Sequence, residues 1–254
     1  MVTVEHNAAV AVELVVFTVL DEQLAVLAAV RQVMPFRNRL ELPGGFLLPD
    51  EDLPEAAERE LWEKTRIESA RVYLEQLGTY ASADRDPRGR VVTVAYLALV
   101  PGMSADLTGG SALTEGGRTH EQDDGEDGPE LPEERAAEAE WVPADELLDD
   151  PDSLAFNHHR ILGDGVERVR ARLEYSSLGT LFCADEFTIG DLRKVYEAVW
   201  DTTIDPRNFH RKVSGTADFV VETGRVTSGE GGRPARLYRL GDVTVLNPPL
   251  RRPA

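Results

Sequence analysis

One segment of the sequence, residues 41–67, constrains the fold more than any other. It reads ELPGGFLLPDEDLPEAAERELWEKTRI, so a glycine pair and a run of acids precede a stretch of helix-forming residues. Pro54 favours a helix that begins near it, and Asp50 to Asp52 would lie at the positive end of that helix. Glu60 and Glu63, three residues apart, would share one helix face, where carboxylates can jointly hold Mg²⁺. The segment therefore predicts a helix with a chemical role, and the alternative is a merely solvated, charged face.

Strand-forming segments lie on both sides of this helix in the sequence. Residues 10–20 (VAVELVVFTVL) and 24–30 are apolar and rich in β-branched side chains, and the turn-like residues 21–23 between them predict a hairpin. Residues 91–100 (VVTVAYLALV) predict another strand, preceded by the irregular polar loop 84–90 (DRDPRGR). A helix flanked by strands in this order predicts an α+β domain.

Segment 41–67 resembles the Nudix box, whose pattern sets a glycine, single acids, an Arg-Glu pair, a Glu-Glu pair and a second glycine at fixed spacings. The resemblance implies a Nudix α/β/α sandwich with a mixed sheet. It also implies that Glu51, Glu60 and Glu63 are metal ligands and that Arg59 has a structural role. The residues that match the pattern are Gly45, Glu51, Arg59, Glu60, Leu61, Glu63 and Ile67.

Two residues depart from the box. Lys64 replaces the second acid of the Glu-Glu pair, and Arg66 replaces the glycine that lets the helix end in a left-handed conformation. Two unit charges about 4 Å apart interact by on the order of 4 kcal/mol at an effective dielectric constant near 20, so an ammonium at position 64 repels a metal ion. We therefore expect weak Mg²⁺ binding at most and impaired hydrolysis. The helix should persist, because Lys favours helix as well as Glu does.

Candidate ligand-binding residues surround the box. Arg85 and Arg88 of loop 84–90 carry guanidinium groups, which present several donors to phosphate oxygens. Glu41 and Gly45 are further candidates. The alternative interpretation of the two arginines is an ordinary solvated, charged turn.

Residues 114–140 interrupt the N-terminal part of the chain. They hold 11 acids against 2 bases, with several glycines and no aromatic residue, which predicts a solvated, disordered insertion rather than a domain boundary. Residues 160–175 (RILGDGVERVRARLEY) then place apolar side chains at helical spacing. This helix is predicted to link two domains.

The C-terminal part predicts two helices followed by a hairpin. Residues 189–200 form the first helix, with Thr188 as its N-cap, and Asp205-Pro206 begins the second. Segments 219–226 and 236–240 alternate like a hairpin with a glycine-rich tip. This is the order of a winged helix-turn-helix domain. The second helix would be the recognition helix, with Phe209 and Val213 in the core, and the predicted DNA contacts are Arg207, Asn208, Arg211, Lys212, Arg233 and Arg236.

The distribution of charge permits this interpretation. The chain has a net charge of −19, which argues at first against binding to DNA phosphates. Residues 176–254, however, hold 11 Lys and Arg against 10 Asp and Glu, so residues 1–175 carry a net −20. Residues 205–254 have a net +4, from 9 bases and 5 acids. This end of the chain can therefore face phosphate, and a winged helix that docks a protein is the alternative.

Nearly the whole chain resembles the Nudix-related transcriptional regulators of the NrtR type, through the box and through segments such as DRDPRGRVVTVAYLAL, EFTIGDLRKVYEAV and IDPRNFHRKV. The resemblance implies a sensor domain for ADP-ribose or a related nucleotide over residues 1–160, a linker helix over 161–175, and a winged helix over 176–254. It also implies a homodimer that represses genes of NAD metabolism by binding a double-stranded DNA operator. The alternative function is an active ADP-ribose pyrophosphatase whose winged helix serves assembly only.

Segment LAFNHH departs from the family at Asn157, where an Asp is expected. The neighbouring His158 and His159 are predicted to be surface or interface residues rather than ligands, because ligand histidines usually recur at helical or longer spacing. The single cysteine, Cys183, is predicted to be a small core residue. With no apolar run long enough to span a membrane and no secretion signal at the N-terminus, we expect a cytoplasmic protein.

Overall fold

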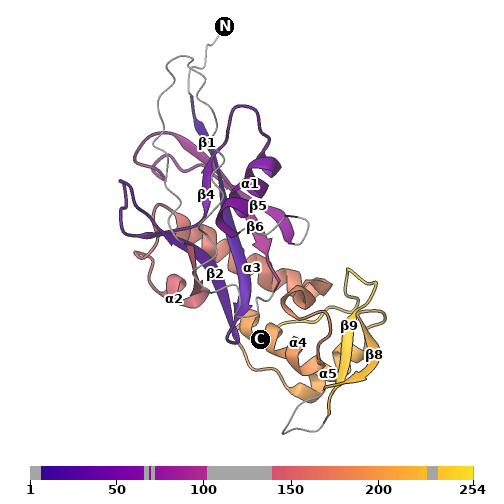
Figure 1. Cartoon of the computed structure of the whole chain (residues 1–254). Helices are drawn as coiled ribbons and strands as arrows, with labels where there is room; N and C mark the ends of the chain where they lie inside the picture. The colour runs from indigo at the N-terminus through magenta and orange to yellow at the C-terminus, as the bar shows by residue number, and fades with distance from the viewer. Residues whose placement is uncertain (1–6, 66–68, 70–71, 102–138, 228–233, 254) are drawn as a thin grey trace, which may run out of the picture.

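A computed structural model describes residues 7–65, 69, 72–101, 139–227 and 234–253 of the chain (Figure 1). The N-terminal part contains a seven-stranded sheet in the order β3-β2-β1-β6-β5, with β4 paired to β1 and β7 paired to β2. The β1–β6 pair is parallel and the other pairs are antiparallel, so the predicted mixed sheet is confirmed. The strands are β1 (Ala9–Leu20), β2 (Gln23–Val30), β3 (Leu40–Glu41), β4 (Gly44–Phe46), β5 (Tyr73–Tyr80), β6 (Val91–Leu99) and β7 (Ala139–Pro143).

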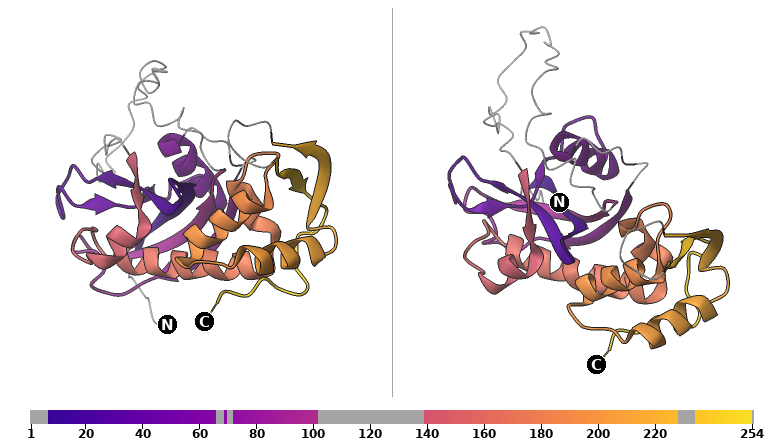
Figure 2. Two further views of the ribbon diagram at one scale, coloured as in Figure 1. Left: turned by 90° about the horizontal axis from the view of Figure 1, so that it is seen from below. Right: turned by 60° about the horizontal axis from the view of Figure 1, so that its bottom comes forward.

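Helices cover both faces of this sheet (Figure 2). Strand β1 buries alternate side chains on opposite faces, because successive residues of a strand point in opposite directions. Val12, Leu14 and Val16 pack with α1 (Leu53–Thr65) on one face. Val15 and Phe17 pack on the other face, in the core that also holds residues of α2 (Ala144–Asp149) and α3 (His158–Tyr175). Burial on both faces explains why β1 is apolar nearly throughout.

The C-terminal part has the predicted helix-turn-helix-hairpin order. Thr188 caps α4 in a reciprocal capping box with Asp191, and the side chain of Asp205 accepts a hydrogen bond from the Asn208 N–H at the start of α5. Strands β8 and β9 form an antiparallel hairpin with an irregularity between Glu222 and Val226. The elements are a 3₁₀ helix (Ser177–Phe182), α4 (Ile189–Trp200), α5 (Pro206–Gly215), β8 (Val220–Val226) and β9 (Arg236–Leu240).

Helix α3 belongs to the cores of both parts. Its apolar side chains and those of α4 and α5 form one continuous buried cluster with the sheet. The Trp200 indole N–H donates to the Arg170 carbonyl at 3.2 Å, and the Tyr196 hydroxyl donates to the Leu173 carbonyl at 3.1 Å. A Cβ atom added at Gly165 would lie only 2.9 Å from a Val15 methyl group, so α3 and the sheet are in close contact there. The predicted linker helix is thus a packed structural element.

Some sequence expectations need correction. Residues 139 and 140 belong to β7 and not to the predicted insertion 114–140, whose other residues lie outside the described ranges. The hairpin tip, including Arg233, and the box residues Arg66 and Ile67 also lie outside them.

Cys183 packs at the edge of the main core, and burial raises the pKa of its thiol to about 12. Within the described part, no helix is long and apolar enough to cross a membrane.

Candidate ligand site and nucleic-acid interface

The acids of the box converge on the guanidinium of Arg59. Its Nε and Nη2 donate to the two oxygens of Glu51 at 3.0 and 2.8 Å, and Nη1 donates to Glu60 Oε1 at 2.7 Å. A Glu63 oxygen lies 3.9 Å from Nη1. The planar fork of an arginine matches two carboxylates at once, which explains a structural role for this residue.

The glycine of the box makes room for one of these carboxylates. A Cβ atom built on Gly45 would lie 2.2 Å from Oε1 of Glu60, which is buried beneath it. Burial raises the pKa of Glu60, in spite of the opposing charges of Arg59 and Lys64. Gly45 therefore serves the packing of Glu60, and its predicted contact with a ligand stays a prediction.

These residues do not fit a magnesium centre in the described structure. Among the described residues, no group of three or more His, Cys, Asp or Glu side chains is arranged to hold a metal ion. Glu51 and Glu60 face a guanidinium instead of a common open position, and Lys64 contributes a positive charge near Glu60. Hard cations need several convergent oxygens, which this arrangement does not offer.

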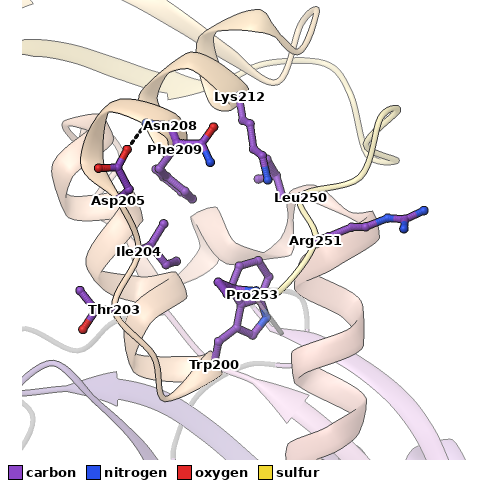
Figure 3. Close-up of a pocket in the computed structure, with 10 residues that line it drawn as sticks. All are labelled: Trp200, Thr203, Ile204, Asp205, Asn208, Phe209, Lys212, Leu250, Arg251 and Pro253. Carbon is purple, nitrogen blue, oxygen red and sulfur yellow. Dashed lines mark hydrogen bonds between the residues drawn. The ribbon is translucent and has the colours of Figure 1, made fainter.

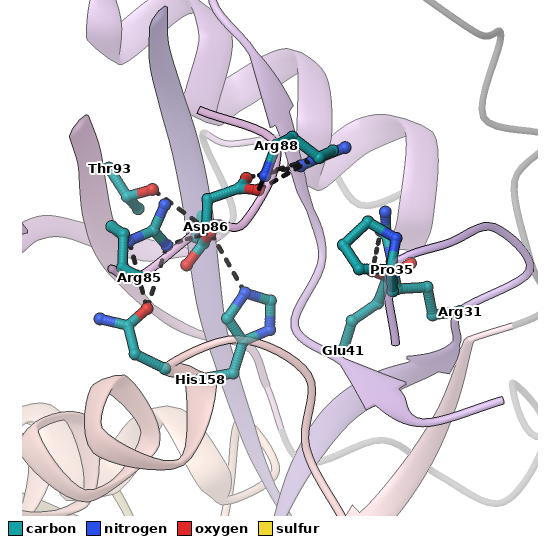
Figure 4. Close-up of polar contacts among 10 residues, drawn as sticks. Arg31, Pro35, Glu41, Arg85, Asp86, Arg88, Thr93 and His158 are labelled. Atoms are coloured by element: carbon teal, nitrogen blue, oxygen red, sulfur yellow. Dashed lines mark hydrogen bonds and ion pairs between the residues drawn. The ribbon is translucent and has the colours of Figure 1, made fainter. Parts of the chain in front are cut away.

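A buried polar cluster lies on the opposite side of β1 from α1 (Figure 4). Glu13 of β1 accepts a hydrogen bond from Arg85 Nη2 at 2.9 Å, and its carboxylate lies 3.3 Å from the Thr93 hydroxyl of β6. Arg85 also donates from Nε and Nη2 to the Asn157 amide oxygen, at 3.2 and 3.1 Å. With 2% of its side chain exposed, Arg85 can reach a ligand phosphate only by leaving one of these partners.

His158 completes this cluster, so the prediction that it is a surface or interface residue is wrong. The residue is 3% exposed and begins α3, and its Nδ1 accepts a hydrogen bond from the Leu42 N–H at 3.0 Å. An Nδ1 that accepts leaves the ring proton on Nε2, which lies 3.2 Å from Glu13 Oε1. The ring therefore bridges α3 and the sheet. Its neighbour His159, half-buried, bonds through Nε2 to the Leu148 carbonyl at 2.9 Å.

Glu13 was not among the predicted site residues, although the sequence contains a signal for it. Glu13 is the one charged residue in the otherwise apolar strand segment 10–20. A buried charge must have a partner, so an acid at such a position indicates an ion pair or a functional site. Burial would raise the pKa of Glu13, but His158 and Arg85 outweigh burial and hold the pKa at about 2.

The low pKa of Glu13 predicts a pH dependence of stability. Because the pKa is depressed from 4.5 to about 2 in the folded state, the stabilisation is complete above pH 4.5 and is lost as the pH falls toward 2. The shift corresponds to about 3 kcal/mol. We expect the difference in free energy of unfolding between wild type and Glu13→Gln to shrink by about this amount between pH 7 and pH 2, as measured by urea titration. A difference independent of pH would contradict the depressed pKa.

The other ligand candidates lie at the edge of this cluster. Glu41 of β3 accepts a hydrogen bond from Arg31 Nη1 at 2.6 Å, and Arg31 also donates to the Pro35 carbonyl at 2.6 Å (Figure 4). Arg88 forms a bidentate pair with Asp86, and about a third of its side chain is exposed. Of the two predicted loop arginines, Arg88 is thus the one that a phosphate in solvent can approach directly.

Helix α5 presents a polar face to solvent. The predicted side chains Arg207, Asn208, Arg211 and Lys212 are all exposed, whereas Phe209 and Val213 are buried as predicted. Arg211 Nη2 donates to the Asn208 amide oxygen at 2.7 Å, which joins two of them on one surface. Arg236 of β9 is exposed and pairs with Glu222 of β8 at 2.8 Å. This combination of polar helix and hairpin suits contact with a DNA groove and its phosphates.

The C-terminal residues lie beside this helix. A pocket of about 270 Å³ separates α5 from the segment that carries Leu250 and Arg251, and Trp200 of α4 forms its floor (Figure 3). The Leu250 N–H donates to the Glu174 carbonyl of α3 at 2.9 Å, and the Leu246 N–H donates to the Tyr175 carbonyl at 2.9 Å. The end of the chain therefore ties the winged helix to α3.

Comparison with known proteins matches both parts of the chain. The NUDIX domain model matches residues 10–163, and the NrtR DNA-binding winged helix domain model matches residues 180–240. The chain is 31% identical over 230 residues to the ADPR responsive transcriptional repressor NtrR of Acinetobacter baylyi, over 90% of this chain and 80% of the relative. It is also 31% identical over 146 residues to an ADP-ribose pyrophosphatase of Methanocaldococcus jannaschii, over 58% of this chain and 68% of the relative.

The structure gives the same result. It is similar to the crystal structure of Shewanella oneidensis NrtR complexed with a 27mer DNA, with a TM-score of 0.70 and 31% sequence identity, over 91% of this chain and 93% of that chain. The likeness covers the Nudix fold, the winged helix and α3 between them. The chain therefore belongs to the NrtR family of Nudix-related transcriptional regulators.

Proposed function

We propose that this protein is an ADP-ribose-responsive transcriptional repressor. The observation that carries the proposal is the likeness over about nine-tenths of the chain to a repressor of this name and to a DNA-bound NrtR. The exposed polar face of α5 supports it, because a winged helix reads DNA through such a face. Residues 205–254, with a net +4, form the basic end of an otherwise acidic chain.

The effector site in this proposal lies around the buried polar cluster. Arg88 and Glu41 lie at its edge, Gly45 follows in β4, and Arg85 is inside it. ADP-ribose carries two phosphates, for which guanidinium groups are suitable partners. Because α3 begins at this cluster and its other end packs against α4 of the winged helix, occupation of the site can bias the position of the DNA-binding surface.

We infer that the active species is a homodimer. Operators read by helix-turn-helix proteins contain two half-sites about one helical turn apart, which two recognition helices contact together. One domain with a net +4 would bind duplex DNA weakly on its own. A protein that binds its operator as a monomer in sedimentation experiments would contradict this inference.

The proposal is tested by binding of the purified protein to DNA from upstream of NAD-biosynthesis genes. We expect tight binding at a stated salt concentration and a change of affinity when ADP-ribose is added. Coupling of this kind typically changes affinity about 5- to 150-fold. A scrambled duplex of the same length is the control. Absence of specific binding with and without ADP-ribose would overturn the proposal.

A second candidate function is hydrolysis of ADP-ribose, favoured by the relative named as a pyrophosphatase and by the acids retained in the box.

We propose that the substitutions at positions 64 and 66 have removed this activity. Lys64→Glu combined with Arg66→Gly is then expected to raise Mg²⁺-dependent release of AMP at least about tenfold, because a correctly held metal contributes several kcal/mol to such reactions. Adding Glu63→Gln to this background is the control and should abolish the gain. Efficient hydrolysis by the wild type would instead support the second function.

A further inference from the structure

Segment 246–253 (LNPPLRRP) is a basic part of the chain to which the domains described above assign no role. It contains two arginines and no acid, so its net +2 is half of the net +4 of residues 205–254. The NrtR winged helix domain model ends at residue 240 and does not include it. Because the rest of the chain is acidic, a local excess of positive charge matters for any contact with phosphate.

Two buried leucines fix this segment to the protein. Leu246 and Leu250 are 2% and 3% exposed and belong to the main core. Their backbone N–H groups donate to the carbonyls of Tyr175 and Glu174, in the last turn of α3. Arg251 therefore follows a residue that is already held in place. A cation presented in this way loses less conformational freedom on binding than one on a flexible arm.

The segment runs along one flank of α5. Asn208 and Lys212 are one helical turn apart, and they line the same pocket as Arg251 and Pro253 (Figure 3). Both views of Figure 2 show the segment beside this helix. A DNA major groove is about 12 Å wide, and a helix with its side chains is about 10–12 Å across. An element beside a helix that occupies the groove therefore faces a phosphate backbone.

The two arginines of the segment differ in their surroundings. Arg252 donates to both carboxylate oxygens of Glu167 in α3, at 3.5 and 3.4 Å. Arg251 is exposed and forms no hydrogen bond or ion pair with another residue in the described part of the chain. Its side chain extends away from the pocket (Figure 3). The acid that also lines the pocket, Asp205, caps α5 by accepting from the Asn208 N–H.

We propose that Arg251 binds a phosphate of the DNA backbone beside the groove that α5 enters. This inference rests on the proposed function and extends its DNA-binding surface to segment 246–253. The ligand is the backbone of duplex DNA rather than a base edge, because the arginine lies beside the recognition helix and not on it. Phosphate contacts of this kind fix the position of a protein on the duplex and carry no sequence information.

The inference predicts a loss of affinity that does not depend on sequence. Arg251→Ala is expected to weaken binding to the operator and to a scrambled duplex by the same factor. It should also lower the slope of log affinity against log salt by about one, so that the advantage of the wild type shrinks about 3.5-fold between 50 and 200 mM salt. Arg251→Lys keeps the charge and should retain the wild-type slope. Fluorescence anisotropy with the full chain measures these affinities.

Arg252→Ala is the matched control, because it removes the same charge from the next residue, whose guanidinium Glu167 already holds. It should keep the wild-type slope, and unchanged urea midpoints and ADP-ribose affinity show that the variants are folded. An Arg251→Ala slope equal to that of wild type, or equal losses for both alanine variants, would overturn the contact and leave the repressor function standing. A wild-type protein without specific operator binding would overturn the proposed function as well.

Discussion

Replacing Arg85 with alanine is expected to destabilise the protein by about 3–5 kcal/mol. The Arg85 side chain is 2% exposed and pairs with Glu13, so its removal leaves the Glu13 carboxylate in the interior with only His158 and Thr93 as neighbours. Breaking a buried ion pair from one side has an effect of this size, because the charge that remains was taken out of water for that partner. The loss also frees Asn157, whose amide oxygen accepts from Arg85. Urea unfolding monitored by tryptophan fluorescence measures the change.

Two variants make this result specific. Arg90→Ala in the same loop is the matched control, since Arg90 is exposed and its side chain donates to the Ala81 carbonyl. Its effect should stay within about 0.5 kcal/mol. Adding Glu13→Gln to Arg85→Ala removes the buried negative charge that has lost its arginine, and we expect it to recover part of the lost stability. An Arg85→Ala protein as stable as wild type would mean that the carboxylate of Glu13 is hydrated.

Removal of the arginines of α5 is expected to have the largest effect on DNA binding. Arg207 and Arg211 are exposed on the side of the helix opposite the buried Phe209. A good contact of an arginine with a base edge is typically worth about 1–3 kcal/mol, so Arg207→Ala and Arg211→Ala should each weaken operator binding about 5- to 150-fold. Fluorescence anisotropy with a labelled operator duplex measures the affinity.

The salt dependence tells which kind of contact each arginine makes. Loss of a phosphate contact weakens binding to all sequences and lowers the slope of log affinity against log salt by about one, whereas loss of a base contact relaxes discrimination at one position. Lys194→Ala is the matched control: this lysine of α4 pairs with Glu22 in the turn between β1 and β2. If both α5 variants bind like this control, α5 is not the recognition helix.

Much of the fold could be predicted because its signals are local. Pro54 and Pro206 indicate the starts of α1 and α5, and strict spacing in the box identifies the helix that carries Glu60. The alternation of apolar side chains in the strands is also contained within each segment. By contrast, β7 follows a long acidic stretch, and its short, partly exposed sequence has no comparable pattern of its own. It is a strand because β2 provides a partner.

The candidate site was less predictable, because tertiary contacts create it. Arg85 was recognised from its loop, but nothing near it in the sequence reveals that Glu13 is its partner, 72 residues away. The role of His158 depends on a hydrogen bond from the Leu42 N–H, 116 residues away. The sequence around His158, where a second histidine follows it directly, does not indicate this partner. Sequence spacing therefore indicates where the chemistry lies, but not which groups share it.

Helix α3 has a mechanical consequence. Its 18 residues form a rod about 27 Å long, at 1.5 Å per residue, with His158 at one end and the winged helix packed along the other. A tilt of about 5° at the first end displaces the second by about 2 Å, which is enough to move a recognition helix out of register with a groove. In the proposed function, thermodynamic linkage makes the coupling reciprocal: the factor by which ADP-ribose changes the affinity for the operator is also the factor by which the operator changes the affinity for ADP-ribose. The proposed repressor would therefore respond to ADP-ribose at one concentration when it is bound to its operator and at another concentration when it is free.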